Sequence, residues 1–276
     1  MKGRVLIVAG SDSGGGAGIQ ADIKTVTALG AYAETALTAV TAQDTLAVHA
    51  IEPVSPALVA RQIEVVLNDP GADAVKTGML ATGAIAAATA DALERAKFQG
   101  PIVVDPVMAA TSGTRLLDDD ALEILKRRLI ARAALVTPNI PEAERLLGRK
   151  IPDVGAMERA ARDLLAFGAR AVLLKGGHLE GPNAVDVLAT EGRVERFESP
   201  RLESRNTHGT GCTLASAIAT GLAQGLDLVE SIARARAYVR EAIRTAPGFG
   251  RGHGPLNHGH TVRPFEFPTR RPGERT

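Results

Sequence analysis

One stretch of the chain combines residue types that could bind an anion and move a proton. It runs Asn206-Thr207-His208-Gly209-Thr210-Gly211-Cys212-Thr213, and small apolar residues that favour a helix follow it. Glycines let the backbone approach a ligand closely. The first turn of a helix offers unpaired N–H groups and a partial positive charge. The stretch therefore predicts an anion site at a helix N-terminus.

The only cysteine of the chain, Cys212, falls in the same predicted first turn. A thiol there is expected to have its pKa lowered toward the thiolate, which would make it a base or a nucleophile. Free cysteines are, however, usually buried and inert. By itself the stretch leaves two interpretations open, a catalytic loop or a glycine-rich turn before a core helix.

The composition is that of a globular protein without a strong charge. The 276 residues are 45% hydrophobic and carry a net charge of +1, so we expect neither a nucleic-acid nor a membrane partner. Aromatic residues make up 3%, which removes the stacking surfaces of single-strand binders. No apolar run approaches a membrane span. A single cysteine excludes an internal disulfide and indicates a cytoplasmic protein.

The elements that would position the glycine stretch alternate along the chain. Short apolar runs, such as residues 5–9 and 102–104, are typical of strands buried on both faces of a parallel sheet. Helical patterns lie between them, and the segments that flank Glu191-Gly192 indicate a hairpin. The alternation predicts an α/β fold with a doubly wound, mostly parallel central sheet flanked by helices. Residues 48–54 predict a short strand in a small flap.

No repeat or linker divides the sequence, which indicates one domain over residues 1–262. Residues 263–276 are rich in proline and arginine and lack apolar periodicity. We expect them to form a flexible tail.

Polar and small residues follow most of the predicted buried strands. Ligands of open parallel sheets bind beyond the carboxyl ends of the strands. The residues there are Gly10–Asp12, Gln43, Asp44, Gly78, Met79, Asp105, Asn139, Glu142, Lys175–Gly177 and the Gly209 loop. A single one would be an ordinary strand end, but together they indicate a site.

The charged types at this edge suit a magnesium–nucleotide phosphate. Lys175 would supply a cation, and Asp105 and Glu142 would supply carboxylates for the metal. Each also has an ordinary explanation, because a carboxylate in the first turn of a helix is stabilising anyway. Gln43 offers both a donor and an acceptor, which suits the edge of an aminopyrimidine.

Several segments together resemble a known family. They are residues 9–12 and 15–22, Thr41-Ala42-Gln43, Gly78-Met79-Leu80, Asp105-Pro106-Val107-Met108, residues 137–143, Lys175-Gly176-Gly177-His178, residues 206–213 and residues 252–258. In this order they resemble the hydroxymethylpyrimidine/phosphomethylpyrimidine kinases of thiamine biosynthesis, within the ribokinase-like superfamily. Sugar kinases of that superfamily are similar but place aspartate where Cys212 stands. Ser13-Gly14 and Asp44 depart from the family pattern.

The resemblance implies a ribokinase-like fold, a homodimer, and a kinase that uses ATP and Mg²⁺. The reaction it implies is phosphorylation of 4-amino-5-hydroxymethyl-2-methylpyrimidine, and then of its monophosphate to the pyrophosphate. The implied catalytic residues are Cys212 as the base, Gly209, Thr210 and Gly211 as the anion hole, and Lys175. The implied substrate residues are Gly10, Asp22, Gln43, Met79 and Val107. The implied nucleotide residues are Asn139, Lys175, Thr207 and His208, and the implied metal residues are Glu142 and Asp105.

Three other functions fit parts of the sequence. A pyridoxal- or pyridoxine-type vitamin kinase of the same superfamily would use the same phosphate-binding residues. A cysteine hydrolase would pair Cys212 with His208, but it would leave the phosphate-suited edge unexplained. A ligand sensor on the same fold would have no need for Lys175, Glu142 and Cys212 together.

Overall fold

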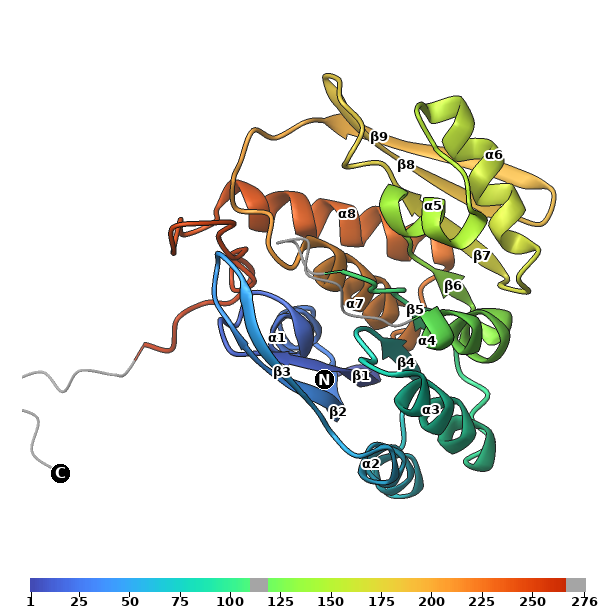
Figure 1. Ribbon diagram of the computed structural model, residues 1–276. Coiled ribbons are helices and arrows are strands. Elements are labelled where there is room, and N and C mark those ends of the chain that lie inside the picture. Colours follow the sequence, from blue (N-terminus) through green and yellow to red (C-terminus); the bar gives the residue numbers. More distant parts are fainter. Residues whose placement is uncertain (110–118, 267–276) are drawn as a thin grey trace, which may run out of the picture.

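The structure, a computed structural model, describes residues 1–109 and 119–266 (Figure 1). Its strands are β1 (Arg4–Asp12), β2 (Tyr32–Gln43), β3 (Val48–Pro53), β4 (Ala74–Thr77), β5 (Ile102–Val104), β6 (Leu135–Val136), β7 (Ala171–Lys175), β8 (Asn183–Thr190) and β9 (Arg193–Pro200). Its α-helices are α1 (Gly18–Ala28), α2 (Pro56–Asn68), α3 (Gly83–Arg95), α4 (Asp119–Ile124), α5 (Ile140–Leu147), α6 (Val154–Leu165), α7 (Thr210–Ala223) and α8 (Leu228–Arg244). After α4 the chain makes a π-helical turn (Leu125–Leu129) and a 3-10 turn (Ile130–Arg132).

The strands form one sheet in the order β3-β2-β1-β4-β5-β6-β7-β8-β9. Every neighbouring pair from β2 to β7 is parallel. At one edge β3 pairs antiparallel with β2, and at the other β8 and β9 extend the sheet as the predicted hairpin. The predicted mostly parallel α/β fold is therefore confirmed, and the carboxyl ends of β1, β4, β5, β6 and β7 meet at one edge.

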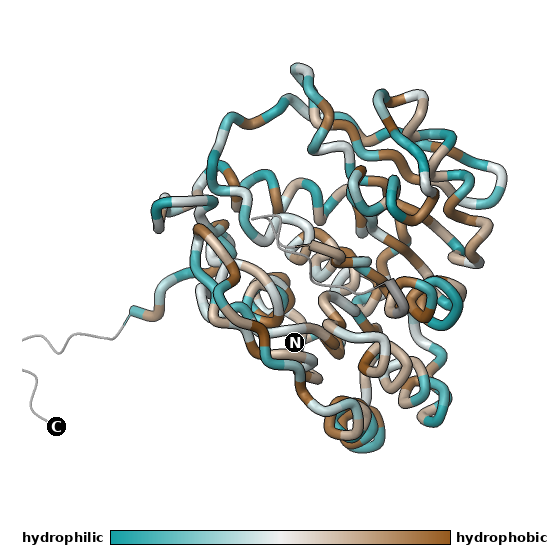
Figure 2. Tube along the Cα trace, viewed as in Figure 1, coloured by the Kyte–Doolittle hydropathy of each residue, from teal (hydrophilic) through white to brown (hydrophobic). Residues whose placement is uncertain are grey.

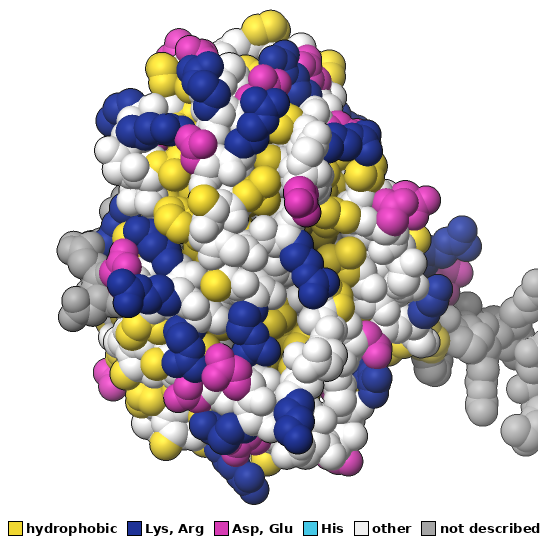
Figure 3. Space-filling view, turned by 90° about the vertical axis from the view of Figure 1, so that its right-hand side faces the viewer, with side chains coloured by type: hydrophobic (Ala, Val, Ile, Leu, Met, Phe, Trp, Pro, Cys, Tyr) yellow, Lys and Arg dark blue, Asp and Glu magenta, His cyan; other side chains and the backbone are white. Residues whose placement is uncertain are grey.

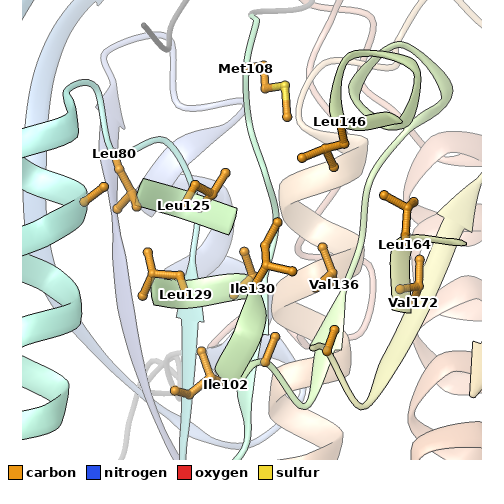
Figure 4. Packing of buried hydrophobic residues seen from close by; sticks show 14 of the residues in the cluster. Leu80, Ile102, Met108, Leu125, Leu129, Ile130, Val136, Leu146, Leu164 and Val172 are labelled. Atoms are coloured by element: carbon orange, nitrogen blue, oxygen red, sulfur yellow. The ribbon is translucent and has the colours of Figure 1, made fainter. Parts of the chain in front are cut away.

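Helices cover both faces of the sheet (Figure 1). One apolar core lies between the sheet and α1, α7 and α8, and the other lies between the sheet and α2 to α6. Figure 4 shows the second core, where Ile102 and Val136 of the sheet face Leu129 and Ile130. Because helices cover both faces of the sheet, a central strand such as β1 is a nearly continuous apolar run. Figure 2 colours the chain by hydropathy in the same view as Figure 1.

Helix α7 is the central helix of the site and is buried on nearly every side. Its residues 213–221 are all buried, and most of them are small. Small side chains permit close packing against α8, where a Cβ added to Gly221 would lie 2.5 Å from Ser231 Oγ. The position of the loop that precedes α7 is therefore fixed by the core.

Several of the helices begin at a polar side chain that caps their first turn. Ser55, Thr82, Asp153 and Asp227 each accept a hydrogen bond from a backbone N–H in the first turn of the helix that follows. No helix in the described ranges is long and apolar enough to cross a membrane. On the face shown in Figure 3, basic and acidic side chains are intermingled. Most of the predicted tail, residues 267–276, lies outside the described residues.

Candidate active site

The predicted site residues gather around two joined hollows at the carboxyl ends of the parallel strands. The smaller one, about 150 Å³, is lined by Gly10, Gln43, Met79, Asp105, Val107, Asn139, Glu142, Lys175, His208, Gly209, Gly211 and Cys212. The larger one, about 930 Å³, shares Asn139, Glu142, Lys175 and Gly211 with it and adds Thr207 and Thr210. Among the residues to which the resemblance assigns a role, Asp22 is the one that lines neither hollow, and of the other residues predicted at this edge Asp44, Gly78 and Gly176 also lie outside both.

The Gly209 loop packs against the glycine loop that follows β1. Gly209 has a φ of 82°, and a Cβ there would lie 1.8 Å from the carbonyl oxygen of Gly16. Gly18 has a φ of 57°, and its Cβ would lie 2.4 Å from Gly10 O. Only glycine is compatible with both the positive φ and the close approach. The contact between the loops holds the N-terminus of α7, and its unpaired N–H groups, at the cavity.

Lys175, at the end of β7, pairs with Asp105, which follows β5. The distance from Lys175 Nζ to Asp105 Oδ1 is 2.9 Å, and the same oxygen accepts a hydrogen bond from Thr137 Oγ1 at 3.0 Å. Burial opposes the charge on Lys175, but Asp105 and Glu142 outweigh it and raise the pKa of the lysine. Lys175 therefore stays cationic at neutral pH.

Asn139 and Glu142 form a reciprocal cap at the start of α5. Asn139 Oδ1 accepts a hydrogen bond from the N–H of Glu142 at 2.9 Å, and Glu142 Oε2 accepts one from the N–H of Asn139 at 2.8 Å. The Glu142 side chain is buried, and burial raises its pKa to about 7 in spite of the nearby Lys175. The cap thus holds a carboxylate at the junction of the hollows, where a cation would favour its charged form.

Cys212 lies in the first turn of α7, as predicted, but its expected low pKa is wrong. Burial, aided by Asp22 and Asp105 and opposed by Lys76, raises the pKa of the thiol to about 11. The helix N-terminus does not outweigh the loss of solvation in this surrounding. Cys212 is therefore a protonated thiol at neutral pH in this structure, which gives no support to a cysteine hydrolase.

His208 lies on a different side of the site from the one predicted. Its Nε2 is 2.8 Å from Asp12 Oδ2 and 3.4 Å from Gln43 Nε2, so it stands beside the expected substrate residues rather than in the larger hollow. Burial opposes the charge on Asp12, but hydrogen bonds from His208 and from the N–H groups of Ala17 and Gly14 lower the pKa of this carboxyl. Asp12 thus joins both glycine loops.

Asp22 and Lys76 form a fully buried ion pair behind the small cavity. Lys76 Nζ is 2.8 Å from Asp22 Oδ2, and neither side chain is exposed to solvent. Ser216 of α7 donates a hydrogen bond of 2.6 Å to Asp22 Oδ1. Asp22 therefore contacts Lys76 and Ser216 and does not line the cavity, so the expected direct contact with the substrate is wrong. Lys76, which lines the cavity, was missed although a lysine inside the apolar run of β4 was a visible signal.

The β2–β3 hairpin, the predicted flap, is tied to the C-terminal segment. The carbonyl of Thr45 accepts a hydrogen bond from the N–H of His253 at 3.0 Å, and Thr45 Oγ1 accepts bonds from Arg251 N and Gly252 N. Farther along, the N–H of His208 donates to Gly254 O at 3.1 Å. These contacts bring the flap, the Gly209 loop and the C-terminal segment together above the cavity.

No group of three or more His, Cys, Asp or Glu side chains within residues 1–109 and 119–266 is arranged to hold a metal by itself. Asp105 and Glu142 nevertheless fit Mg²⁺, which usually takes one or two carboxylates and completes its shell with water and phosphate oxygens. The raised pKa of Glu142 indicates a carboxylate whose charge is incompletely compensated.

Comparison with known proteins shows which family the chain belongs to. The model of the family described as phosphomethylpyrimidine kinase matches residues 12–257. The chain belongs to this family. The match covers all of the glycine loops, the ion pairs and the cap described above.

Relatives of this kinase family agree. The chain is 56% identical over 257 residues to a bifunctional thiamine biosynthesis protein of Geobacter sulfurreducens, covering 93% of this chain and 52% of that protein, so it spans about half of that relative. It is 48% identical to the hydroxymethylpyrimidine/phosphomethylpyrimidine kinase of Rhizobium meliloti, over 92% of this chain and 96% of the relative.

Solved structures of kinases share the fold. The phosphomethylpyrimidine kinase of Clostridium difficile has a TM-score of 0.78 and 41% identity, covering 88% of this chain and all of that one. The pyridoxal kinase of Bacillus subtilis in complex with ADP has a TM-score of 0.87 and 34% identity, covering 94% of this chain and 98% of that one. The ribokinase-like fold that the resemblance implied is thereby confirmed.

Proposed function

We propose that this chain uses ATP to phosphorylate the hydroxymethyl group of 4-amino-5-hydroxymethyl-2-methylpyrimidine, and then the monophosphate to the pyrophosphate. One observation carries the proposal. A small cavity with an amide, an apolar side chain and glycines opens into a larger hollow across Lys175, Glu142 and Gly211. A single-ring substrate fits the first and a nucleotide the second, so the phosphate to be transferred would lie at their junction.

The substrate would bind between β2, β4 and the first glycine loop. Gln43 would meet the aminopyrimidine edge, because an amide can both donate and accept a hydrogen bond. Met79 and Val107 would contact the ring. Gly10 permits this fit, since a Cβ there would lie 2.3 Å from Met79 Cε. Asp12 and His208 hold Gln43 and the loop in place.

The groups at the junction of the two hollows are already in place to stabilise the negative charge of the transferred phosphate. The substrate hydroxyl oxygen forms a bond to the terminal phosphorus of ATP while the bond from that phosphorus to the ADP oxygen breaks. Lys175 and the N–H groups at the start of α7 would bind the oxygens of the transferred group. A Cβ at Gly211 would lie 3.2 Å from Lys175 Nζ, so the glycine leaves space for those oxygens. Thr207, Thr210 and Asn139 border the nucleotide side.

Asp105 and Glu142 would hold Mg²⁺ together with the phosphates. A bound Mg²⁺ would neutralise phosphate charge. The residues of this chain supply two carboxylates, one already paired with Lys175 and one capped by Asn139. Glu142 lines both hollows, and Asp105 lines the smaller one beside Lys175, which lines both.

Cys212 would accept the proton of the attacking hydroxyl. Because burial raises the pKa of its thiol to about 11, only a small fraction is thiolate at neutral pH. Phosphoryl transfer depends mainly on position and charge stabilisation. The backbone N–H groups and Lys175 therefore contribute more to the rate than Cys212.

A pyridoxal-type vitamin kinase is the second candidate. The observation in its favour is the close structural match to the pyridoxal kinase of Bacillus subtilis. The higher identities, however, belong to relatives named for the pyrimidine reaction.

The deciding experiment measures ATP consumption by the purified protein with Mg²⁺ and one of three substrates: hydroxymethylpyrimidine, its monophosphate, or pyridoxal. Turnover of the monophosphate to the pyrophosphate is the expected result. Turnover of pyridoxal alone would move the chain to the second candidate. No turnover with any of the three would contradict both and revive the ligand-sensor hypothesis.

We further propose that the kinase domain spans residues 1–262, works in the cytoplasm and forms a homodimer. Support comes from the family resemblance and from the single cysteine, which suits a reducing compartment. Light scattering on the purified chain, and on a version that ends at residue 262, tests the domain span and the homodimer. A stable dimer is expected in both cases, and a monomer would contradict it.

A further inference from the structure

Lys76 is the largest fully buried side chain among the residues that the structure describes. It lies on the buried strand β4, between Val75 and Thr77, where it lines the small cavity, and no part of the proposed mechanism uses it. A buried ammonium is costly unless an opposite charge compensates it. Asp22 of α1 supplies that charge at 2.8 Å.

The pair is attached to the same helix as the proposed base. Ser216 hydrogen bonds to Asp22, and it lies four residues after Cys212, on the same face of α7. Two packed elements therefore fix the ammonium relative to the thiol. On the other side, a Cβ at Gly78 would lie 3.0 Å from Lys76 Nζ, so Gly78 leaves the ammonium its place beneath the cavity.

The ammonium has hydrogen-bonding capacity to spare. A lysine has three N–H donors, and Asp22 is the only side-chain partner recorded for Lys76 in the described part of the chain. Lys76 also lines the small cavity together with Cys212. The N–H groups of Lys76 that Asp22 does not occupy therefore lie beside the end of the cavity that contains Cys212.

We propose that Lys76, held by Asp22 and Ser216, is a positioning residue whose fixed positive charge stabilises the Cys212 thiolate that then takes the proton of the substrate hydroxyl. This inference rests on the proposed function for its catalytic meaning. In the step, the hydroxyl proton passes to the Cys212 thiolate and the oxygen bonds to phosphorus as ADP leaves. Lys76 neither gains nor loses a proton.

Four charged groups surround the thiol from different elements. Lys76 comes from β4, Asp22 from α1, Asp105 follows β5, and Lys175 ends β7. Lys76 lowers the pKa of Cys212, and Asp22 and Asp105 raise it. Asp22 and Lys76 therefore act on the thiol with opposite signs, although they support each other structurally.

The opposite effects of Lys76 and Asp22 on the pKa of Cys212 provide a test of the proposal. Because the chain has one cysteine, its alkylation by iodoacetamide reports Cys212 alone. The rate is measured by mass spectrometry in magnesium-free buffer at about pH 8.5, well below the thiol pKa, where it follows the thiolate fraction. Lys76→Met is expected to slow alkylation about tenfold, equivalent to one pKa unit. Asp22→Asn is expected to accelerate it, because the ammonium then acts unopposed.

A merely structural role predicts a different pattern. Loosening of the site by either substitution would change the access to Cys212 in the same direction for both variants. Equal signs would therefore overturn the proposal. The exposed Lys150, whose side chain is 88% accessible, supplies the matched control Lys150→Met, which should leave alkylation unchanged.

The single substitution at Lys76 leaves Asp22 buried without its partner and can prevent folding. The double variant Lys76→Met with Asp22→Asn removes both charges together and avoids that problem. It should still alkylate more slowly than the parent, because Lys76 acts on the thiol more strongly than Asp22 does. A rate equal to or above that of the parent would contradict the inference.

Kinase assays separate this inference from the proposed function. In Lys76→Met the acid limb of the kcat–pH profile should move to higher pH, with the KM for ATP unchanged. If the parent protein phosphorylates neither pyrimidine substrate, the proposed function fails while the alkylation result still stands. If the parent is active and the acid limb does not move, this inference fails alone.

Discussion

The two ends of the parallel strands carry similar charged residues in different states. At the carboxyl ends, Asp105 and Asp12 are buried and each has a cationic or potentially cationic partner, Lys175 and His208. At the amino ends, Arg4 pairs with Asp73 on the surface, where the side chains are 44% and 37% exposed. Between these ends the strands are apolar.

Glu34, near the start of β2, shows what burial does without a partner. It is 7% exposed, and neither carboxylate oxygen has a hydrogen-bond partner among the described residues. Burial raises the pKa of Glu34 to about 7, although Arg4 opposes the shift. A perturbed carboxyl is therefore not by itself a functional site. At the carboxyl ends, several charged groups from different elements converge on a cavity, and that convergence indicates function.

The largest effect is expected at Lys175. Lys175→Ala removes the cation that we propose lies beside the transferred phosphate and leaves Asp105 buried without its ion-pair partner. We expect kcat to fall about 10²- to 10³-fold, as when a preorganised donor to a developing charge is lost. Steady-state kinetics with the pyrimidine substrate measure the change, and Lys150→Ala is the control. A change confined to the KM for ATP would show that Lys175 only binds the nucleotide.

Cys212→Ser should have a smaller effect. The thiol is protonated at neutral pH because burial raises its pKa to about 11, so its loss removes little active base. We expect kcat to fall about tenfold, less than for Lys175→Ala, because positioning dominates phosphoryl transfer. The two variants are compared in the same assay. A larger loss for Cys212→Ser would show that proton removal limits the rate.

Glu34→Gln tests the amino end through stability. The folded state raises the pKa of Glu34, so folding favours the protonated carboxyl. The resulting stabilisation is present below the unfolded pKa and is lost as the pH rises from about 4.5 to about 7. The variant lacks this loss and should exceed the parent in unfolding free energy at pH 8 by roughly 1–3 kcal/mol.

Urea unfolding at pH 5 and pH 8 measures the Glu34 effect. The difference between the variant and the parent must grow with pH. A difference that does not change with pH would mean that folding leaves the pKa of Glu34 unchanged. The kinase activity, whose residues lie at the opposite ends of the strands, serves as the internal control and should not change.

Arg4→Met is expected to have the smallest effect. Exposed ion pairs contribute little because water already solvates both charges. Since Arg4 also lowers the pKa of Glu34, the substitution is made in the Glu34→Gln variant to isolate the Arg4–Asp73 pair. The thermal midpoint should not change measurably. A clear decrease would place a structural ion pair at the amino ends and would weaken the contrast between the two ends.

Much of the site was predictable because its signals are local. The alternation of apolar runs with helical patterns predicts the sheet, and polar residues directly after the runs predict the edge where Asp105, Asn139 and Lys175 meet. The Gly209 loop also follows from local rules, since the positive φ and the helix start depend on adjacent residues. Lys76 could have been found by the same reasoning, as a charge within a buried strand.

Residue types and their order along the chain are enough to predict which residues reach the carboxyl edge of the sheet and that a helix begins at the Gly209 loop. How the charges of these residues are balanced depends on the tertiary fold. The Lys76–Asp22 contact joins residues 54 positions apart, and the His208–Asp12 contact joins residues 196 apart. A pKa depends on burial and on such neighbours in space. For that reason Cys212 has a raised pKa although it lies at a helix N-terminus, as the sequence predicts.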